Sequence, residues 1–131
     1  MGTQQLLLII IGVVVIGIMI AVGIAMFTDN SASVNRDAIA NDLVHAASKA
    51  QAYWRRPQIL GGGGNSFRGF DLRTAFVKLL NENGTFKVEG TPSDSVITIS
   101  GTGLEGGYDD TKPVKVSITV RQSETEVEEV N

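Results

Sequence analysis

The sequence has no cysteine, only one histidine, and no charged residue before Asp29. Without cysteine the chain has no disulfide, no thiolate zinc site and no cysteine nucleophile. The single His45 leaves little for a metal centre or for a serine–histidine pair. The 14 acidic residues outnumber the 11 basic ones, so no large basic surface is expected. These absences argue against an enzyme, a resident cofactor and a nucleic-acid partner.

The uncharged N-terminal stretch is the most informative part of the chain. Residues 6–27 are 22 consecutive apolar or glycine residues. At ~1.5 Å per residue such a helix is roughly 33 Å long, enough to cross a bilayer core of about 30 Å. A cleaved secretory signal has a shorter apolar region behind a basic start, and this segment has neither property. We therefore predict a retained hydrophobic helix.

The segment that follows has the pattern of an amphipathic helix. Apolar side chains recur at steps of three and four, namely Ile39, Leu43, Ala46, Ala47, Ala50, Tyr53 and Trp54. Arg36 is expected on another face, and Pro57 is the first proline of the chain. We predict one helix over residues 1–56, with a membrane or filament-core part (1–28) and an amphipathic part (29–56). Residues 28–31 are the weak point of this helix, where a kink or break would fall.

Residues 57–131 are predicted to form a small head domain with an acidic C-terminal tail. Asp71 is placed to N-cap a short helix from Leu72 to about Asn81, with Phe76 on its apolar face. Alternating apolar residues predict three short antiparallel strands, around Phe86 and Val88, around Ile97 and Ile99, and over residues 114–120.

The connections of the head are predicted from glycine and proline. Turns are expected at residues 90–92 and within residues 101–107, and the four glycines at 61–64 are expected to form a flexible connector. A sheet this small needs a helix over its apolar face. The fold class is therefore α+β, in which the amphipathic half of a long N-terminal helix packs on a small antiparallel sheet.

This organisation resembles the type IV pilins and the related pseudopilins of type II secretion. The resemblance covers the architecture of residues 1–56 and only the topology of the head. If Met1 is the first residue of the mature chain, it implies that Gln5 stands where most pilins have a glutamate that pairs with a neighbour's terminal amine. Gln5 can accept a hydrogen bond but cannot neutralise an ammonium. If Met1 is the encoded start, the segment is instead an uncleaved signal anchor.

The family's usual proline near position 22 is absent, since Val22 stands there. Gly12, Gly17 and Gly23 are the candidates for close helix approach or local weakness instead. The candidate assembly residues are accordingly Met1, Gln5 and these three glycines.

The resemblance implies a structural subunit of an extracellular, type IV pilus-like filament at the cell surface, inserted in the membrane before assembly. Its partners would be further copies of itself in a helical homopolymer and an inner-membrane assembly machinery. Two alternatives stay open: a pseudopilin of a secretion machine, and a single-pass membrane protein with a small external domain that does not polymerise.

Three features of the head are weaker candidates for chemistry. Asp109 and Asp110 lie in a glycine-rich turn that offers carboxylate oxygens to calcium, although a solvated turn is the favoured interpretation. Asn83 begins an Asn-Gly-Thr glycosylation sequon. Tyr53 and Trp54 are interpreted as aromatic anchors of the head.

Overall fold

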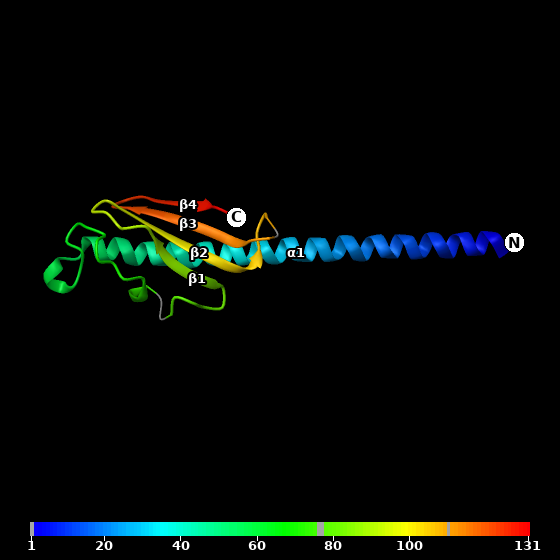
Figure 1. The fold of residues 1–131 in the computed structure, drawn as a ribbon, viewed down its shortest axis with the longest axis horizontal. Coiled ribbons are helices and arrows are strands. Elements are labelled where there is room, and N and C mark those ends of the chain that lie inside the picture. The colour runs from blue at the N-terminus through cyan, green and yellow to red at the C-terminus, as the bar shows by residue number, and fades with distance from the viewer. Residues whose placement is uncertain (1, 76–77, 110) are drawn as a thin grey trace. The chain divides into compact units, whose positions relative to one another are not determined.

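The computed structural model describes residues 2–75, 78–109 and 111–131. Its elements are α1 (Gly2–Arg55), two short 3-10 helices, η1 (Gln58–Leu60) and η2 (Leu72–Thr74), and the strands β1 (Gly84–Glu89), β2 (Val96–Gly106), β3 (Pro113–Arg121) and β4 (Thr125–Glu129). The chain divides into two compact units, Met1–Ser31 and Ala32–Asn131. The predicted α+β fold is confirmed, because the long N-terminal helix packs on an antiparallel sheet (Figure 1).

Helix α1 is continuous through residues 28–31, the segment identified as its weak point. The Thr28 hydroxyl donates a hydrogen bond to the carbonyl of Ile24 at 3.0 Å. A threonine that bonds back to its own helix in this way does not pull the backbone into a competing turn. No glycine or proline follows between Gly23 and Pro57, and the segment is rich in alanine.

The sheet is an antiparallel meander in the order β1-β2-β3-β4. The three predicted strands correspond to β1, β2 and β3, and the predicted turn at residues 90–92 joins the first two. Strand β4 was not predicted, because the acidic tail was expected to be solvated. It pairs with β3, with Val127 opposite Ile118. All five residues of β4 are exposed, and Val127 is its one apolar residue, so the strand lacks the alternation that marks a buried face.

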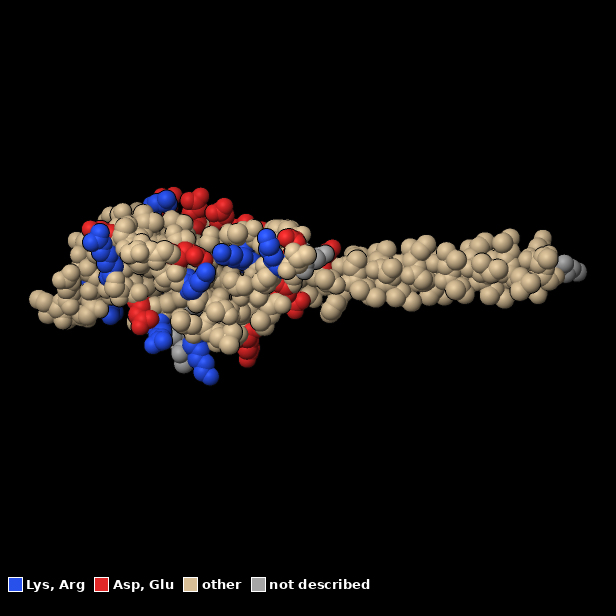
Figure 2. Space-filling model, in the orientation of Figure 1, with Lys and Arg blue, Asp and Glu red and all other residues tan. Residues whose placement is uncertain are grey.

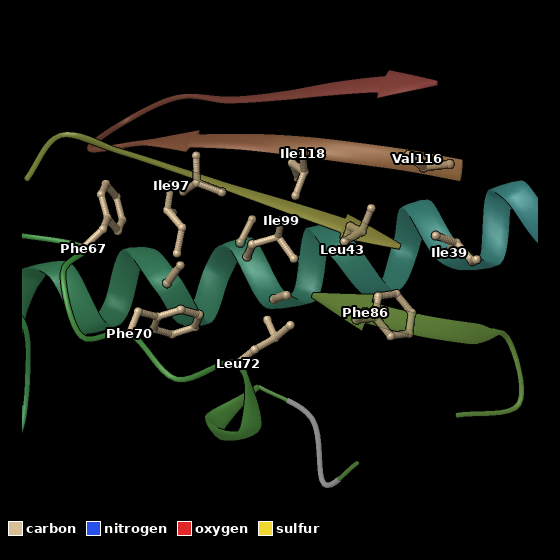
Figure 3. Close-up of a cluster of buried hydrophobic side chains, with 14 of the residues drawn as sticks. Ile39, Leu43, Phe67, Phe70, Leu72, Phe86, Ile97, Ile99, Val116 and Ile118 are labelled. Carbon is tan, nitrogen blue, oxygen red and sulfur yellow. The ribbon is translucent and has the colours of Figure 1, made fainter. Parts of the chain in front are cut away.

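The core of the second unit lies between α1 and the inner face of the sheet (Figure 3). The helix contributes its predicted apolar stripe, in which Ile39, Leu43 and Ala46 have no exposed surface. The sheet contributes Phe86 from β1, Ile97 and Ile99 from β2, and Val114, Val116, Ile118 and Val120 from β3. The alanine side chains of the stripe are small, so the β-branched side chains of the sheet can pack directly against the helix.

The glycine-rich residues 101–107 are mostly strand, which corrects the expectation of a turn there. Strand β2 runs to Gly106, and β3 begins at Pro113. Gly101 faces the helix: a Cβ at this position would lie 2.5 Å from Ile39 Cγ2 and 2.9 Å from the Phe86 ring. The glycine is therefore required by the close approach of helix and sheet and does not mark a turn.

The four glycines at 61–64 form an ordered cap at the end of α1, so the expectation of a flexible connector is wrong. Main-chain N–H groups of the loop donate to carbonyls of the last helical turn: Gly63 to Tyr53 at 2.8 Å, Gly64 to Arg56 at 3.0 Å and Asn65 to Trp54 at 2.8 Å. A Cβ at Gly62 would overlap the Arg56 carbonyl. The loop thus satisfies carbonyls that a helix end leaves without partners.

Among the described residues of the helix predicted from Leu72 to Asn81, only those of η2 are helical. Asp71 caps it as expected, its carboxylate accepting from the N–H of Arg73 at 2.9 Å. Further along, Leu80 forms an isolated antiparallel bridge with Thr85, and the Leu79 carbonyl accepts from the N–H of Phe86 at 2.8 Å. Phe76 lies outside the described residues.

Candidate functional site

Residues 6–27 present a helical surface that is apolar on every side. All of these residues are exposed except Gly12, which is half-buried. Monomeric soluble proteins rarely expose apolar patches of more than a few hundred Å², whereas 22 residues at ~100 Å² each offer about 2200 Å². Helix α1 is long and apolar enough to cross a membrane, as an anchor or as a signal segment. Figure 2 shows that this surface carries no acidic or basic side chain.

Gln5 lies in the first turns of α1 with its side chain exposed. Within the described part of the chain its amide has no hydrogen-bond partner, so both its donor and its acceptor are available. Met1, the other polar candidate for assembly, lies outside the described residues.

The three glycines of the apolar segment have open space around them. No atom of the chain lies within 4 Å of a Cβ built on Gly12, Gly17 or Gly23. Because 11 residues are close to three turns of a helix, Gly12 and Gly23 lie on nearly the same face, while Gly17 lies about 140° away. A Cβ at these positions meets no atom of its own chain beyond the local helix backbone, while replacing glycine also raises the helix propensity of the segment.

Tyr53 and Trp54 anchor the loop after α1, as the sequence predicted. The Tyr53 ring meets Phe70 edge-on at a centroid distance of 5.4 Å, and its hydroxyl donates to the Arg68 carbonyl at 2.9 Å. The Trp54 ring lies 6.3 Å from that of Phe67. Through these contacts both aromatic side chains hold the loop after α1 against the end of the helix.

Arg36 is a buried residue, although it was expected on a polar face of the helix. It is 7% exposed, and its Nη2 donates to the main-chain oxygen of Asn131 at 3.1 Å. The guanidinium lies 4.1 Å from the centre of the Tyr108 ring, and its Nε is 3.9 Å from the Glu129 carboxylate. Glu129 reaches this cluster from β4, Tyr108 from the segment after β2 and Asn131 from beyond β4, so no local sequence pattern indicates the cluster.

The Tyr108 hydroxyl connects the same cluster to β4. It donates to Glu129 Oε2 at 2.8 Å, and this hydrogen bond raises the pKa of the phenol against the opposing effect of the Arg36 charge. Asn131 completes the connection, because its amide donates to the carbonyls of Lys112 and Pro113. The end of the described chain is thus hydrogen-bonded to Arg36 of α1 and to the carbonyls of Lys112 and Pro113.

The weak calcium candidate gains no support from the geometry. The Asp109 carboxylate accepts from the hydroxyl of Thr111 at 2.6 Å and from its N–H at 3.1 Å, and these bonds lower the pKa of Asp109. Asp110 lies outside the described residues. The parts of the chain that the structure describes contain no group of three or more His, Cys, Asp or Glu residues that could hold a metal ion.

The sequon residue Asn83 belongs to a polar network beside the helix. Its side-chain amide donates to Asp42 Oδ2 at 2.8 Å, and Asn81 donates to the same oxygen at 3.0 Å. The Asn83 carbonyl accepts from the side chain of Asn35 at 2.9 Å. The nitrogen that would carry a glycan is therefore engaged within the head.

A charged cluster lies on the outer face of the sheet. The Ser100 hydroxyl donates to Glu89 Oε1 at 2.7 Å, and Lys87 and Lys115 approach the same oxygen to 3.3 and 3.4 Å. The hydrogen bond from Ser100, followed by the interaction with Lys87, lowers the pKa of Glu89. The cluster therefore connects side chains of three adjacent strands, β1, β2 and β3.

Comparisons with models of protein families, with curated proteins and with solved structures find no match to this chain.

Proposed function

We propose that this chain is a structural subunit of an extracellular, type IV pilus-like filament, in which the apolar helices of many copies pack together. One observation carries the proposal: the exposed apolar helix of residues 6–27 continues without a break into the helix that forms the core of the head. A simple membrane anchor usually joins its domain through a polar linker, and α1 has none.

Hydrophobic burial by itself does not drive the chain from a membrane into a filament. Lipid is as apolar as a neighbouring helix, so the transfer gains little from burial. Helix packing and contacts between heads must stabilise the polymer, and a membrane-bound machinery must extract each subunit. Without cysteine these contacts are noncovalent, and reducing agents should leave the filaments intact.

The experiment that tests this function is electron microscopy of material sheared from the cell surface, with mass spectrometry of the subunit and its N-terminus. The proposal expects filaments whose main component is this chain. Recovery of the chain only from the membrane fraction, without surface filaments, would favour the non-polymerising membrane protein. Short membrane-bound assemblies that shearing does not release would favour the pseudopilin.

Substitutions at the apolar glycines test whether the helices pack on one another. Gly12→Leu, Gly17→Leu and Gly23→Leu leave the charge of the segment unchanged, and the Cβ that each adds meets no atom of its own chain beyond the local helix backbone. We expect at least one of them to reduce filament yield or change filament diameter, because overpacking is costly where helices are close. Ile10→Leu is the matched control and should be tolerated. Normal filaments from all three variants would contradict the proposed packing.

Gln5 tests the role of the first helical turns. A hydrogen bond from a charged amine to its amide is worth about 1.5–3 kcal/mol. If Gln5 accepts such a bond from a neighbour's terminus, Gln5→Leu should reduce piliation. Gln5→Glu should be tolerated, because glutamate keeps a hydrogen-bond acceptor and adds a negative charge. Normal piliation in Gln5→Leu would show that the apolar helix and the heads alone set the register.

A further inference from the structure

A polar cleft lies beside the C-terminal end of α1, where the loop after the helix meets the turn between β1 and β2. Its volume is about 480 Å³, and its walls include Tyr53, Gln58, Asn65, Ser66, Arg68 and Asp94, with the loop glycines between them. Sites for small molecules typically have volumes of ~300–1,000 Å³. The cleft belongs entirely to the second unit, so it does not depend on how the apolar segment is packed.

The charged groups of the cleft contact each other and neighbouring polar groups, although both side chains are largely exposed. Asp94 Oδ1 accepts from the Ser66 hydroxyl at 2.8 Å and lies 3.2 Å from Arg68 Nε. The main-chain oxygen of Asp94 accepts from Trp54 Nε1 at 2.9 Å. Among the described residues, Asp94 Oδ2 and the terminal nitrogens of Arg68 have no partner, which leaves one acceptor and several donors close together.

Asn65 contributes an uncharged amide from a left-handed backbone position. Its φ is 66°, the one positive φ of a residue other than glycine in the described ranges. The conformation is fixed because the Asn65 N–H donates to the Trp54 carbonyl at 2.8 Å. Within the same ranges the side-chain amides of Asn65 and Gln58 have no hydrogen-bond partner.

The chemistry of the walls selects the class of ligand. Arg68 and Asp94 are the charged residues among the described lining, and their charges cancel. A phosphate or carboxylate would meet the Asp94 carboxylate, and a cation would meet the Arg68 guanidinium. A neutral sugar satisfies both, because one hydroxyl can donate to Asp94 while its neighbour accepts from Arg68. Amides supply both a donor and an acceptor to further hydroxyls.

We propose that this cleft binds a neutral saccharide, with adjacent hydroxyl groups held between Arg68 and Asp94 and a further hydroxyl held by Asn65. The assignment makes the head a carbohydrate-binding surface in addition to its place in a filament. It does not require polymerisation, and a single membrane-embedded copy should bind.

The test uses the full chain in phosphatidylcholine nanodiscs, because sugar-headed detergents would compete for the cleft. The probes are methyl glycosides of glucose, galactose and mannose, an array of neutral and acidic oligosaccharides, and inorganic phosphate. Binding is followed by saturation-transfer NMR and on the array. We expect at least one neutral saccharide to bind and phosphate not to bind.

Two variants remove cleft contacts while preserving the fold. Asp94→Asn loses the charged acceptor but keeps the side-chain shape, and Asn65→Gly removes the amide while suiting the left-handed backbone. Each should weaken binding about tenfold or more, as expected for a lost hydrogen bond to a sugar hydroxyl. Asp37→Asn, the same chemical change at an exposed helix position outside the cleft, should bind as the parent chain does.

Thermal unfolding of each variant shows that its head is folded under the binding conditions. Failure of the parent chain to bind any neutral saccharide, preferential binding of phosphate, or full binding by both cleft variants would overturn the proposal.

Discussion

Adding one methyl group at Gly101 is expected to destabilise the head, although two effects of the substitution have opposite signs. Gly101 has no left-handed φ, so alanine would be stabilising by ~0.4–1 kcal/mol in the absence of a clash, because it restricts the unfolded chain. The new Cβ, however, would lie 2.5 Å from Ile39 Cγ2 and 2.9 Å from Phe86 Cε1. Both neighbours are at most 1% exposed and have no room to move aside.

The clash should therefore outweigh the gain. Overpacking of a close-packed core typically costs ~1–3 kcal/mol, and for a domain of about 100 residues each kcal/mol lowers Tm by ~4–8 °C. A clash cost of about 3 kcal/mol less the gain of up to ~1 kcal/mol leaves about 2 kcal/mol, so we expect Gly101→Ala to lower the Tm of the head by about 8–16 °C. The assay is unfolding of the full chain in nanodiscs, followed by the fluorescence of Trp54, the single tryptophan, which lies beside Phe67 in the head.

A double-mutant cycle tests whether Ile39 is the cause. Ile39→Ala alone should cost ~2–5 kcal/mol through the cavity that it leaves. In the double variant the alanine methyl at 101 occupies part of that cavity, so the combined loss should be smaller than the sum of the two. Thr102→Ala, on the opposite face of β2, serves as the control strand substitution. An unchanged or raised Tm for Gly101→Ala would refute the close approach of α1 and β2 at this position.

Two further predictions concern the polar groups of the head. Because the Asn83 amide donates to Asp42, we expect intact mass spectrometry to find no glycan on Asn83, and Asp42→Ala to lower the free energy of unfolding by about 1–3 kcal/mol; a glycosylated Asn83 would contradict this. The folded-state pKa of Glu89 is below its usual value of 4.5, so its interactions stabilise the head above pH 4.5 and are lost as the pH falls through the lowered pKa. Glu89→Gln should flatten the fall of Tm below pH 4.5, whereas Glu82→Gln should leave it unchanged.

The sequence predicts the elements of this fold that carry a repeating apolar pattern. The steps of three and four through Ile39 and Leu43 define the buried stripe of α1, and the alternation over residues 114–120 defines the inner face of β3. Strand β4 has no such pattern, because Val127 is its one apolar residue and it forms through main-chain pairing with β3. The sequence pattern also leads to a wrong assignment for glycine. A glycine in a strand that packs against a helix cannot be distinguished from a glycine in a turn unless the packing partner is known.

The site residues differ in the same way. Gln5 and the glycines of the apolar segment stand out in the sequence because their surroundings are uniformly apolar. Arg36 does not, since its burial depends on Tyr108, Glu129 and Asn131, which lie more than 70 positions away in the chain. The cleft around Asp94 likewise joins two loops that are distant in sequence, and no local pattern reports such a meeting.

The composition of the apolar segment restricts what could give a filament its register. The side chains of residues 6–27 include no charged group, no amide and no hydroxyl, so they offer no directional interaction to a neighbouring helix over a length of about 33 Å. Contacts between large apolar side chains are non-directional, so shifting one helix along its neighbour costs little. Only the interlocking of large and small side chains opposes such a shift. The glycines supply the small positions, and Gln5 supplies a hydrogen-bonding group at one end. A polymer built on this helix must therefore take its register from these few positions or from the heads, and the Gly→Leu and Gln5 variants distinguish the two sources.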